Sequence, residues 1–407
     1  MNPSAPASRS APTALRPSSA GAPASAAADA EPERRVTALE LFFDLVFVFA
    51  VTQVTGFISA HPTGMRLLEG VAILVVLWWA WECYAWLGNT AASDEGLFRV
   101  VLLTAMGAML IAAVAVPNAF GGDALAFGLA YAAVRVLHLV AYRLLARSDP
   151  SLLVVVRNLG VMMGPVAVLL VVAGLVDEGL RTACWVAAVT IDVGGLYLAG
   201  VDGWRVDAAH LAERHGLIVI IALGESIVAL GAGAQGHPLD AGLITAILLG
   251  ATVAAGFWWA YFDVVALVAE RRFRRATGVA RARIARDSYT YLHLPMVAGI
   301  ILFAVGVKKT LAHVGDPLAL VPAVALCGGV ALYLLAHVAF RLRNVHSLNR
   351  ARLLCAVLLL ALVPVATEVA ALVALGLTAA AITGVLVYER VRYHDARERI
   401  RHAPSAP

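Results

Sequence analysis

The chain has 407 residues, of which 61% are hydrophobic and 14% are charged. Soluble domains carry about 25% charged residues, so this balance excludes an ordinary water-soluble fold and indicates a protein that the bilayer solvates. The formal net charge is +4, a small sum that excludes little, so the placement of the charges along the chain is more informative.

The first segment, residues 1–33, is rich in Ala, Pro and Ser and has almost no large apolar side chain. Such a composition buries too little surface to offset the entropy of ordering, so we expect a disordered tail. It also lacks the apolar run that marks a secretory signal peptide. The first hydrophobic segment after it is therefore predicted to be a retained membrane span.

Twelve apolar segments follow, each close to the roughly 20 residues that a helix needs to cross the hydrocarbon core. Their approximate limits are 38–60, 67–88, 97–116, 122–146, 151–174, 179–200, 210–232, 239–264, 288–307, 317–341, 351–368 and 370–390. Little more than Thr367 and Glu368 separates the last two, so a single long tilted helix is an alternative there. The sequence predicts an all-α integral membrane protein with about twelve transmembrane helices.

The basic residues that flank these segments fall almost entirely on alternate connections, above all in the arginine-rich stretch 271–286. Because Lys and Arg accumulate on the cytoplasmic side of a membrane protein, both termini are predicted to be cytoplasmic. The arginine-rich stretch is expected to contact anionic lipid headgroups, which makes membrane lipids the expected partner. Nucleic acid is not an expected partner of such a loop.

Two pairs of segments resemble each other in the same order along the chain. The run Trp78-Trp79-Ala80-Trp81 is similar to Trp258-Trp259-Ala260-Tyr261, and the His138 segment is similar to the His337 segment. Transporter folds often contain such duplications, so we predict two parallel six-helix repeats, 34–205 and 206–392, followed by a cytoplasmic tail, 393–407. Chance similarity among Ala, Val, Leu and Trp is the alternative.

Ionisable side chains occur inside several predicted spans, where each costs about 2.5 kcal/mol or more near mid-span. In the first span, Glu40 and Asp44 are four residues apart and share a helix face. Two carboxylates so close repel each other unless one is protonated or a cation lies nearby. The fourth span offers such a cation, Arg135, on one polar ridge with His138.

The other candidate residues for binding a substrate or ion lie in three further spans. They are Glu82 in the second span, His210, Glu213, His215 and Glu225 in the seventh, and Asp263 at the end of the eighth. Most of this charge collects in the predicted cytoplasmic half, which suggests a polar vestibule that opens inward. The alternatives are solvation at helix ends for Glu40, Glu213 and Asp263, and purely structural networks for the deeper residues.

Metal and cofactor motifs are not evident in the sequence. The four cysteines make no CxxC spacing, and residues 210 and 215 lie about 140° apart on a helix, which is unsuited to a shared metal ion. We therefore expect no metal and no cofactor. The tryptophans of the second span are interpreted as an interfacial belt with a packing role, and an aromatic cage for a cation is the alternative.

Two of these stretches carry a family resemblance. Residues 40–50, Glu-Leu-Phe-Phe-Asp-Leu-Val-Phe-Val-Phe-Ala, and residues 210–226, which begin His-Leu-Ala-Glu-Arg-His-Gly and end Leu-Gly-Glu-Ser, resemble the signature segments of the bacterial low temperature requirement protein A family. The matching motif positions are Glu40, Phe43, Asp44, His210, Glu213, Arg214, His215, Gly224 and Glu225. The resemblance implies a multi-pass protein of the bacterial inner membrane, and it implies no settled molecular activity.

Three functions fit these features. A transporter or channel for an ion or small solute would use the intramembrane carboxylates as binding groups. A membrane-embedded enzyme acting on a lipid or isoprenoid substrate would use them as proton donors, with aromatic faces stabilising cationic intermediates. A lipid-interacting or assembly protein would need neither. The sequence names no substrate, coupling ion or oligomeric state, and transport is the preferred hypothesis.

Overall fold

The computed structural model describes residues 35–90, 96–147, 149, 152–201 and 204–402. The predicted disordered tail lies outside this part of the chain. Within the described part every regular element is helical, and the single β-type pairing is an isolated bridge between Pro317 and Ala370. The prediction of an all-α protein is confirmed.

Six long helices make up the N-terminal part of the fold, with one short 3₁₀ turn between the third and the fourth. They are α1 (Ala38–Ala60), α2 (Gly64–Thr90), α3 (Gly96–Ala115), η1 (Val116–Asn118), α4 (Ala124–Leu145), α5 (Leu152–Ala173) and α6 (Glu178–Ala199).

The C-terminal part is more irregular, because two of its long helical segments contain a π-helical stretch. Its elements are α7 (Ala208–Ala234), α8 (Ala241–Phe262), α9 (Val265–Arg275), α10 (Gly278–Ile284), η2 (Ala285–Tyr291), α11 (Leu292–Ala312), α12 (Leu320–Ala323), η3 (Val324–Gly328), α13 (Gly329–Val345), α14 (Arg350–Ala366), α15 (Ala371–Arg392) and α16 (His394–His402). The π-helical stretches are η2 and η3.

Ten helical segments in the described part are long and apolar enough to cross a membrane. The predicted spans at 179–200 and 351–368 form α6 and α14, which are not among these ten. Helix α14 has 17 residues and is therefore about 26 Å long, short of a hydrocarbon core of about 30 Å. Helix α6 carries Asp192 in its second half. The predicted count of twelve spans is thus not confirmed, although a helix occupies each predicted position.

The last two predicted spans are separate helices. Helix α14 ends at Ala366, and the chain passes through a turn before α15 begins at Ala371. The backbone N–H of Ala371 donates to Asp316 and that of Leu372 to Val314, so the turn is tied to the connection after α11. The alternative of one long tilted helix is therefore wrong.

Side-chain caps fix where α1 and α7 begin. Thr37 and Glu40 form a reciprocal capping box at the start of α1, in which the backbone N–H of Thr37 donates to Glu40 Oε2. Asp207 caps α7 by accepting hydrogen bonds from the backbone of Ala209 and His210. Both caps place ionisable residues in the first turns of these helices.

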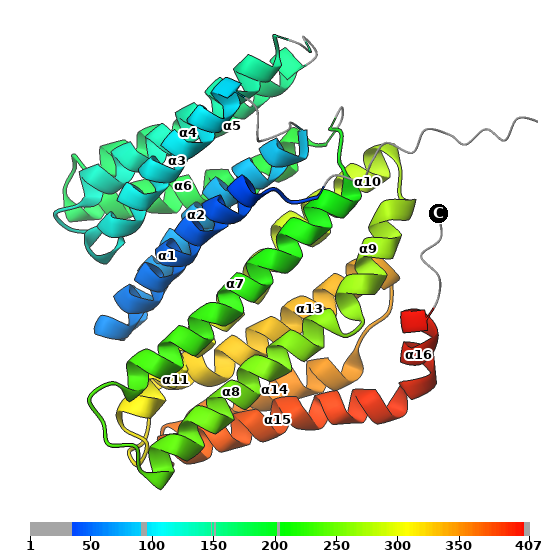
Figure 1. The fold of residues 1–407 in the computed structure, drawn as a ribbon. Coiled ribbons are helices and arrows are strands. Elements are labelled where there is room, and N and C mark those ends of the chain that lie inside the picture. The colour runs from blue at the N-terminus through cyan, green and yellow to red at the C-terminus, as the bar shows by residue number, and fades with distance from the viewer. Residues whose placement is uncertain (1–34, 91–95, 148, 150–151, 202–203, 403–407) are drawn as a thin grey trace, which may run out of the picture. The chain divides into compact units, whose positions relative to one another are not determined.

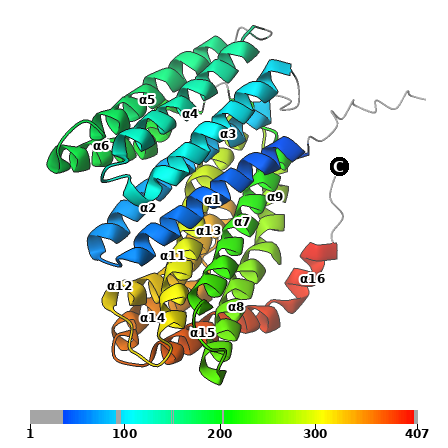
Figure 2. The same cartoon turned by 60° about the vertical axis from the view of Figure 1, so that its left-hand side comes forward.

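Helices α1 and α7 run side by side in the same direction. Glu40, Asp44 and Thr52 of α1 contact, in that order, His210, Arg214 and Glu225 of α7. Figures 1 and 2 show α1, α2 and α7 between the group of α4, α5 and α6 and the group of α8, α14 and α15. The ionisable residues of α1 and α7 therefore lie inside the helix bundle.

Candidate functional site

Two acidic side chains of α1 face two basic side chains of α7 near the first turns of both helices. Arg214 lies 2.7 Å from Asp44 Oδ1 and 3.3 Å from Glu40 Oε1. Nε2 of His210 lies 3.1 Å from the same oxygen of Glu40. Each of these four side chains is at most 3% exposed, so the contacts are sealed from solvent.

Helical spacing explains this arrangement. Glu40 and Asp44 are four residues apart, as are His210 and Arg214, so each pair projects from one face of its helix. Two parallel helices that turn these faces toward each other bring the four groups into one cluster. Gly88 of α2 packs against Glu40 so closely that an added Cβ would collide with the carboxylate, which leaves glycine as the residue that fits.

Trp81 of α2 covers the deeper ion pair. Its indole N–H donates a 2.8 Å hydrogen bond to Asp44 Oδ1, and the Arg214 guanidinium lies 5.6 Å from the centre of its ring. Asp44 Oδ2 and Arg214 Nε have no hydrogen-bond partner in the described part of the chain. A cavity of about 10 Å³ adjoins Glu40 and Arg214, which is room for about one water molecule.

A second acid–base contact joins α7 to α2. His215 Nε2 lies 2.9 Å from Glu82 Oε1, while His215 Nδ1 lies 2.8 Å from the carbonyl of Leu211. A carbonyl only accepts hydrogen bonds, so Nδ1 carries a hydrogen, and one further proton must be shared between Nε2 and Glu82. The other oxygen, Glu82 Oε2, accepts a 3.0 Å hydrogen bond from the hydroxyl of Thr290.

The π-helical stretch η2 supplies the groups that hold this pair. Trp86 donates to the Thr290 hydroxyl and Trp78 to the Thr290 carbonyl, both at 3.0 Å. The added width of a π-helix frees backbone carbonyls that an α-helix would use internally, and such stretches are frequent at functional sites. Next to it, His293 receives a 2.8 Å hydrogen bond from the Tyr261 hydroxyl and donates through Nδ1 to Ser288.

We call the six ionisable residues of these contacts the α1–α2–α7 cluster: Glu40, Asp44, Glu82, His210, Arg214 and His215. It contains three carboxyl groups and one side chain that is always cationic, Arg214. All six residues are at most 3% exposed. Because unbalanced charge is very costly in such surroundings, the cluster needs two further positive charges, which protons or a bound cation can supply.

Arg135 does not balance Glu40 and Asp44, contrary to the sequence-based prediction. Its guanidinium instead forms a buried ion pair with Asp192 of α6, and Tyr131 donates a 2.9 Å hydrogen bond to the same carboxylate. Arg135 also donates to the sulfur of Cys83. Arg214 of α7 takes the place predicted for Arg135.

Three other predicted residues lie apart from the α1–α2–α7 cluster. Glu213 is exposed and accepts a hydrogen bond from the backbone N–H of Val36. Glu225 lies deeper along α7, almost fully buried, and accepts a 2.5 Å hydrogen bond from Thr52 of α1. His138 is buried beside a separate cavity and makes no hydrogen bond of normal geometry in the described structure.

Asp263 belongs to a second network, which we call the C-terminal cluster: Asp263, His337, Arg352, Glu389, Arg397 and Arg401. Arg352 binds both oxygens of Glu389 at 2.9 Å, and Arg397 bridges Glu389 to Asp263. These contacts fasten α16 to the ends of α8 and α15. The carboxylates here are matched by guanidinium groups alone.

Sequence reasoning misses four contributors to these sites. Arg214 is among the family motif positions, but the sequence does not predict it as the counterion of Glu40 and Asp44. Its spacing of four residues from His210, equal to that between Glu40 and Asp44, is the signal that could have identified it. Thr290, Trp81 and Arg352 give no local signal of their role, because their partners come from distant segments. The predicted inward vestibule also differs from the structure, since the clustered side chains are closed off by neighbouring helices.

No group of three or more His, Cys, Asp or Glu residues in the described part is arranged to hold a metal ion. Comparison with known proteins gives a match to the family described as bacterial low temperature requirement A protein (LtrA) over residues 35–387. The chain belongs to the LtrA family. The match contains every residue of the α1–α2–α7 cluster, and it identifies this protein as a multi-pass membrane protein with many apolar helices.

This LtrA-family protein is also similar to an uncharacterized protein of Rhizobium meliloti (strain 1021). The two are 31% identical over 285 residues, which cover 67% of this chain and 69% of the relative. No solved structure matches the chain.

Proposed function

We propose that this protein is a transporter or channel that moves an ion or small solute across the bacterial inner membrane and uses its intramembrane carboxylates as binding groups. The observation that carries the proposal is the charge imbalance of the α1–α2–α7 cluster. Glu40, Asp44 and Glu82 face one guanidinium, that of Arg214. A buried site with excess acid has affinity for protons and cations, which is the property that coupled transport requires.

The contacts between α1 and α7 supply a means of coupling binding to movement. In the closed arrangement, Arg214 holds the carboxyl groups of both Glu40 and Asp44. A proton or cation that reaches Asp44 competes with Arg214 and weakens the link between the two helices. Binding then favours arrangements in which α1 and α7 separate, to the extent that the ligand binds those arrangements more tightly.

The two-repeat organisation is part of this proposal, and the pattern of helix contacts supports it. Helix α1 packs on α3 as α7 packs on α11, α2 packs on α6 as α8 packs on α15, and α4 packs on α5 as α13 packs on α14. Because α1 and α7 run in parallel, they are suitable as the first helices of two repeats related by an axis along the membrane normal. Many transporters place their binding site at such a repeat interface.

The orientation with both termini in the cytoplasm is also proposed. The arginines of α9 and α10 support it, because Arg272, Arg275 and Arg283 are exposed at the facing ends of two candidate helical segments, Ala241–Arg275 and Gly278–Ala312. In this orientation they would contact the anionic headgroups of the cytoplasmic leaflet.

An enzyme acting on a lipid or isoprenoid substrate is the second candidate. A cavity lined by Trp79, Trp86 and Glu82 favours it, because aromatic faces beside a carboxyl group suit a cationic intermediate. The volume of this cavity is about 50 Å³, however, and ligand sites usually measure at least about 300 Å³. Transport therefore fits the structure better.

Reconstitution of the full chain into proteoliposomes tests the proposal. Proton flux is followed with an enclosed pH-sensitive dye after an imposed pH or cation gradient, for wild type, Asp44→Asn and Glu213→Gln. Asp44→Asn keeps the shape of the side chain but removes its charge, and it should abolish flux. Glu213→Gln is the matched control, because Glu213 is exposed and its carboxylate accepts a hydrogen bond from the backbone N–H of Val36, which lies outside the cluster; it should transport like wild type.

Two results would reject transport. One is a wild-type protein that moves neither protons nor alkali cations under any imposed gradient. The other is a folded Asp44→Asn protein, verified by size-exclusion chromatography and its melting temperature, whose flux equals that of wild type.

A further inference from the structure

Glu225 is a buried carboxyl group without a basic partner. It is 2% exposed and lies in the second half of α7. The other buried carboxyl groups in the described part of the chain each contact an arginine or a histidine: Glu40, Asp44, Glu82, Asp192 and Glu389. Across the same residues, Glu225 makes no ion pair. Its charge must therefore be balanced in another way.

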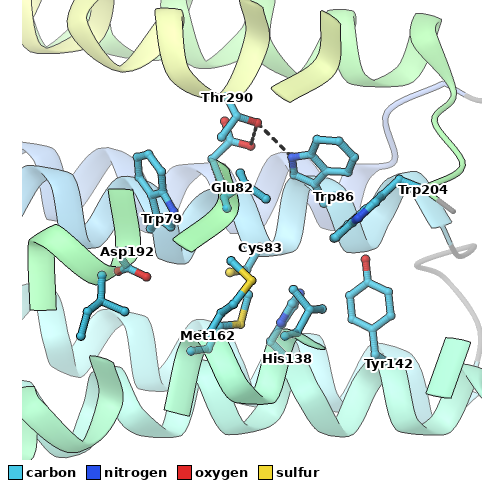
Figure 3. Close-up of a pocket in the computed structure, with 14 residues that line it drawn as sticks. Trp79, Glu82, Cys83, Trp86, His138, Tyr142, Met162, Asp192, Trp204 and Thr290 are labelled. Atoms are coloured by element: carbon cyan, nitrogen blue, oxygen red, sulfur yellow. Dashed lines mark hydrogen bonds between the residues drawn. The ribbon is translucent and has the colours of Figure 1, made fainter. Parts of the chain in front are cut away.

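The cavity between α2, α4, α5 and α6 shows the contrast. Its wall is mostly apolar, and two buried acids, Glu82 and Asp192, border it. Figure 3 shows Glu82 beside Thr290, to which it is hydrogen-bonded. Both acids are already paired, Glu82 with His215 and Asp192 with Arg135. This cavity therefore holds no acid that still needs a partner, whereas the carboxyl group deep in α7 does.

The helices that pack against α7 bring little charge to this position. Lys308 of α11 is the charged side chain that acts on Glu225, and it is half-buried and forms no ion pair with it in the described structure. Helix α8 has no charged residue from Ala241 to Phe262. The charged residues of α1, α2, α9 and η2 meet α7 near its first turns, up to His215. That residue is about 15 Å from Glu225 along the helix.

Two threonines of α1 lie against the carboxyl group of Glu225. The hydroxyl of Thr52 is 2.5 Å from its Oε2, and that of Thr55 lies near the same group. Each hydroxyl also reaches a backbone carbonyl of its own helix, that of Val48 at 3.2 Å and that of Val51 at 3.3 Å. A hydroxyl has one hydrogen, so one that donates to its carbonyl presents only lone pairs to Glu225. A carboxylic acid can donate to one threonine and accept from the other, whereas a carboxylate only accepts.

We propose that Glu225, Thr52 and Thr55 form a proton-binding site, in which Glu225 is a carboxylic acid while α1 and α7 are packed together. A buried carboxylate without a counterion is very costly, and uptake of a proton removes that cost. The role of this site rests on the proposed transport function, for which it names the proton as the transported or coupling ion.

Release of the proton requires separation of α1 from α7. Thr52 then leaves Glu225, and water reaches the carboxyl group. The O–H bond breaks, its electron pair stays on the carboxylate, and the proton passes to a water molecule. The helices pack together again only after a proton returns from water to Glu225. Asp44 has the opposite requirement, because its carboxylate pairs with Arg214 when the helices are packed.

Solid-state NMR of the full chain in lipid bilayers, with ¹³C-carboxyl glutamate, tests whether Glu225 carries the proton. An exposed glutamate has lost its proton at pH 7, so a resonance at the carboxylic-acid position identifies a protonated side chain. The proposal predicts such a resonance in wild type, its loss in Glu225→Gln and its retention in the control Glu213→Gln. If no acid resonance depends on Glu225, the inference is wrong. A bound alkali cation would give that result, because it leaves Glu225 ionised.

Substitutions of Thr52 test its place in the site with the same signal. Thr52→Val keeps the shape of the side chain and removes the hydroxyl, so the acid resonance of Glu225 should shift. Thr52→Ser keeps the hydroxyl and should leave the resonance in place. An identical resonance in all three proteins would show that Thr52 does not bind the carboxyl group.

Flux in proteoliposomes tests whether the proton is exchanged. The Gln side chain resembles a neutral carboxylic acid in size and can both donate and accept hydrogen bonds, so Glu225→Gln should fold. It cannot release a proton, and its flux should be lost. A folded Glu225→Gln protein with wild-type flux, as verified by size-exclusion chromatography, would overturn the exchange of this proton.

These outcomes separate the two proposals. If Asp44→Asn abolishes flux while no acid resonance depends on Glu225, transport stands and the proton-binding site is wrong. If wild type shows no flux while the resonance of Glu225 is as predicted, the site binds a proton and the transport function fails.

Discussion

The α1–α2–α7 cluster and the C-terminal cluster are both networks of acids and bases, and they differ in exposure and in charge balance. The first is buried throughout, whereas the Arg401 side chain of the second is 31% exposed. In the C-terminal cluster, both oxygens of Glu389 are paired with guanidinium groups, and Asn349 adds a further 2.6 Å hydrogen bond. In the α1–α2–α7 cluster, Asp44 keeps one oxygen without a hydrogen bond to any described residue, and His215 shares a proton with Glu82.

Under the proposed function, this difference separates a structural role from a functional one. Arg352, Arg397 and Arg401 equal in number the carboxylates that they bind, Glu389, Asp263 and Glu398, so the C-terminal cluster is complete without any exchangeable proton. The α1–α2–α7 cluster is complete only after it takes up protons or a cation. Burial of charge alone therefore does not indicate function, whereas unbalanced acid in a membrane protein does.

The largest effect is expected from removal of the fixed cation in the α1–α2–α7 cluster. Arg214→Met leaves Glu40 and Asp44 buried without their counterion, which should cost about 3–5 kcal/mol of stability and abolish flux. The melting temperature in detergent and flux in proteoliposomes measure both effects. Arg214→Lys restores the charge and should recover part of the stability. If Arg214→Met melts like wild type, the ion pairs are not the link between α1 and α7.

A smaller effect is expected at the contact between η2 and α2. Thr290→Val removes the hydroxyl that donates to Glu82 and accepts from Trp86. Loss of these hydrogen bonds should cost about 1–3 kcal/mol and slow proton flux, because the His215–Glu82 pair loses its orientation. Thr290→Ser keeps the hydroxyl and should behave like wild type. Equal flux in the Thr290→Val and Thr290→Ser proteins would show that the Thr290 hydroxyl has no role in transport.

The smallest effect on transport is expected in the C-terminal cluster. Replacement of both partners, Arg352→Met with Glu389→Met, exchanges an ion pair for apolar side chains and should stay within about 2 kcal/mol of wild type. Flux per folded molecule should be unchanged, because this cluster takes no part in proton exchange. A large loss of flux at unchanged stability would show that the two clusters do not differ in the way described above.

The sequence predicts the elements of this fold better than their contacts. The positions of the helices follow from apolar runs. The placement of Glu40 and Asp44 on one face of a helix follows from their spacing of four residues. The identity of the cation that binds Glu40 and Asp44 does not follow from the sequence. Arg135 and Arg214 are equally plausible until the packing of α1 against α7 is known. Helices α6 and α14 look like spans in sequence, yet the polarity of one and the shortness of the other set them apart.

The π-helical stretch η2 illustrates the other limit of sequence reasoning. Residues 285–291 contain no Pro or Gly that would indicate a departure from α-helical geometry. The widened turn coincides with hydrogen bonds from Trp78 and Trp86, which lie about 200 residues earlier in the chain. The contacts of Asp263 are also hidden in the sequence, because its ion-pair partners Arg397 and Arg401 come from the far end of the chain.

The most direct measurement of the central claim is infrared difference spectroscopy of the protein in lipid, recorded between acidic and alkaline buffer. The account predicts a protonated-carboxyl band that changes with pH, is lost in Glu82→Gln or Asp44→Asn, and is retained in Glu389→Gln. The absence of such a band, or its assignment to Glu389 alone, would contradict the claim that the α1–α2–α7 cluster binds exchangeable protons.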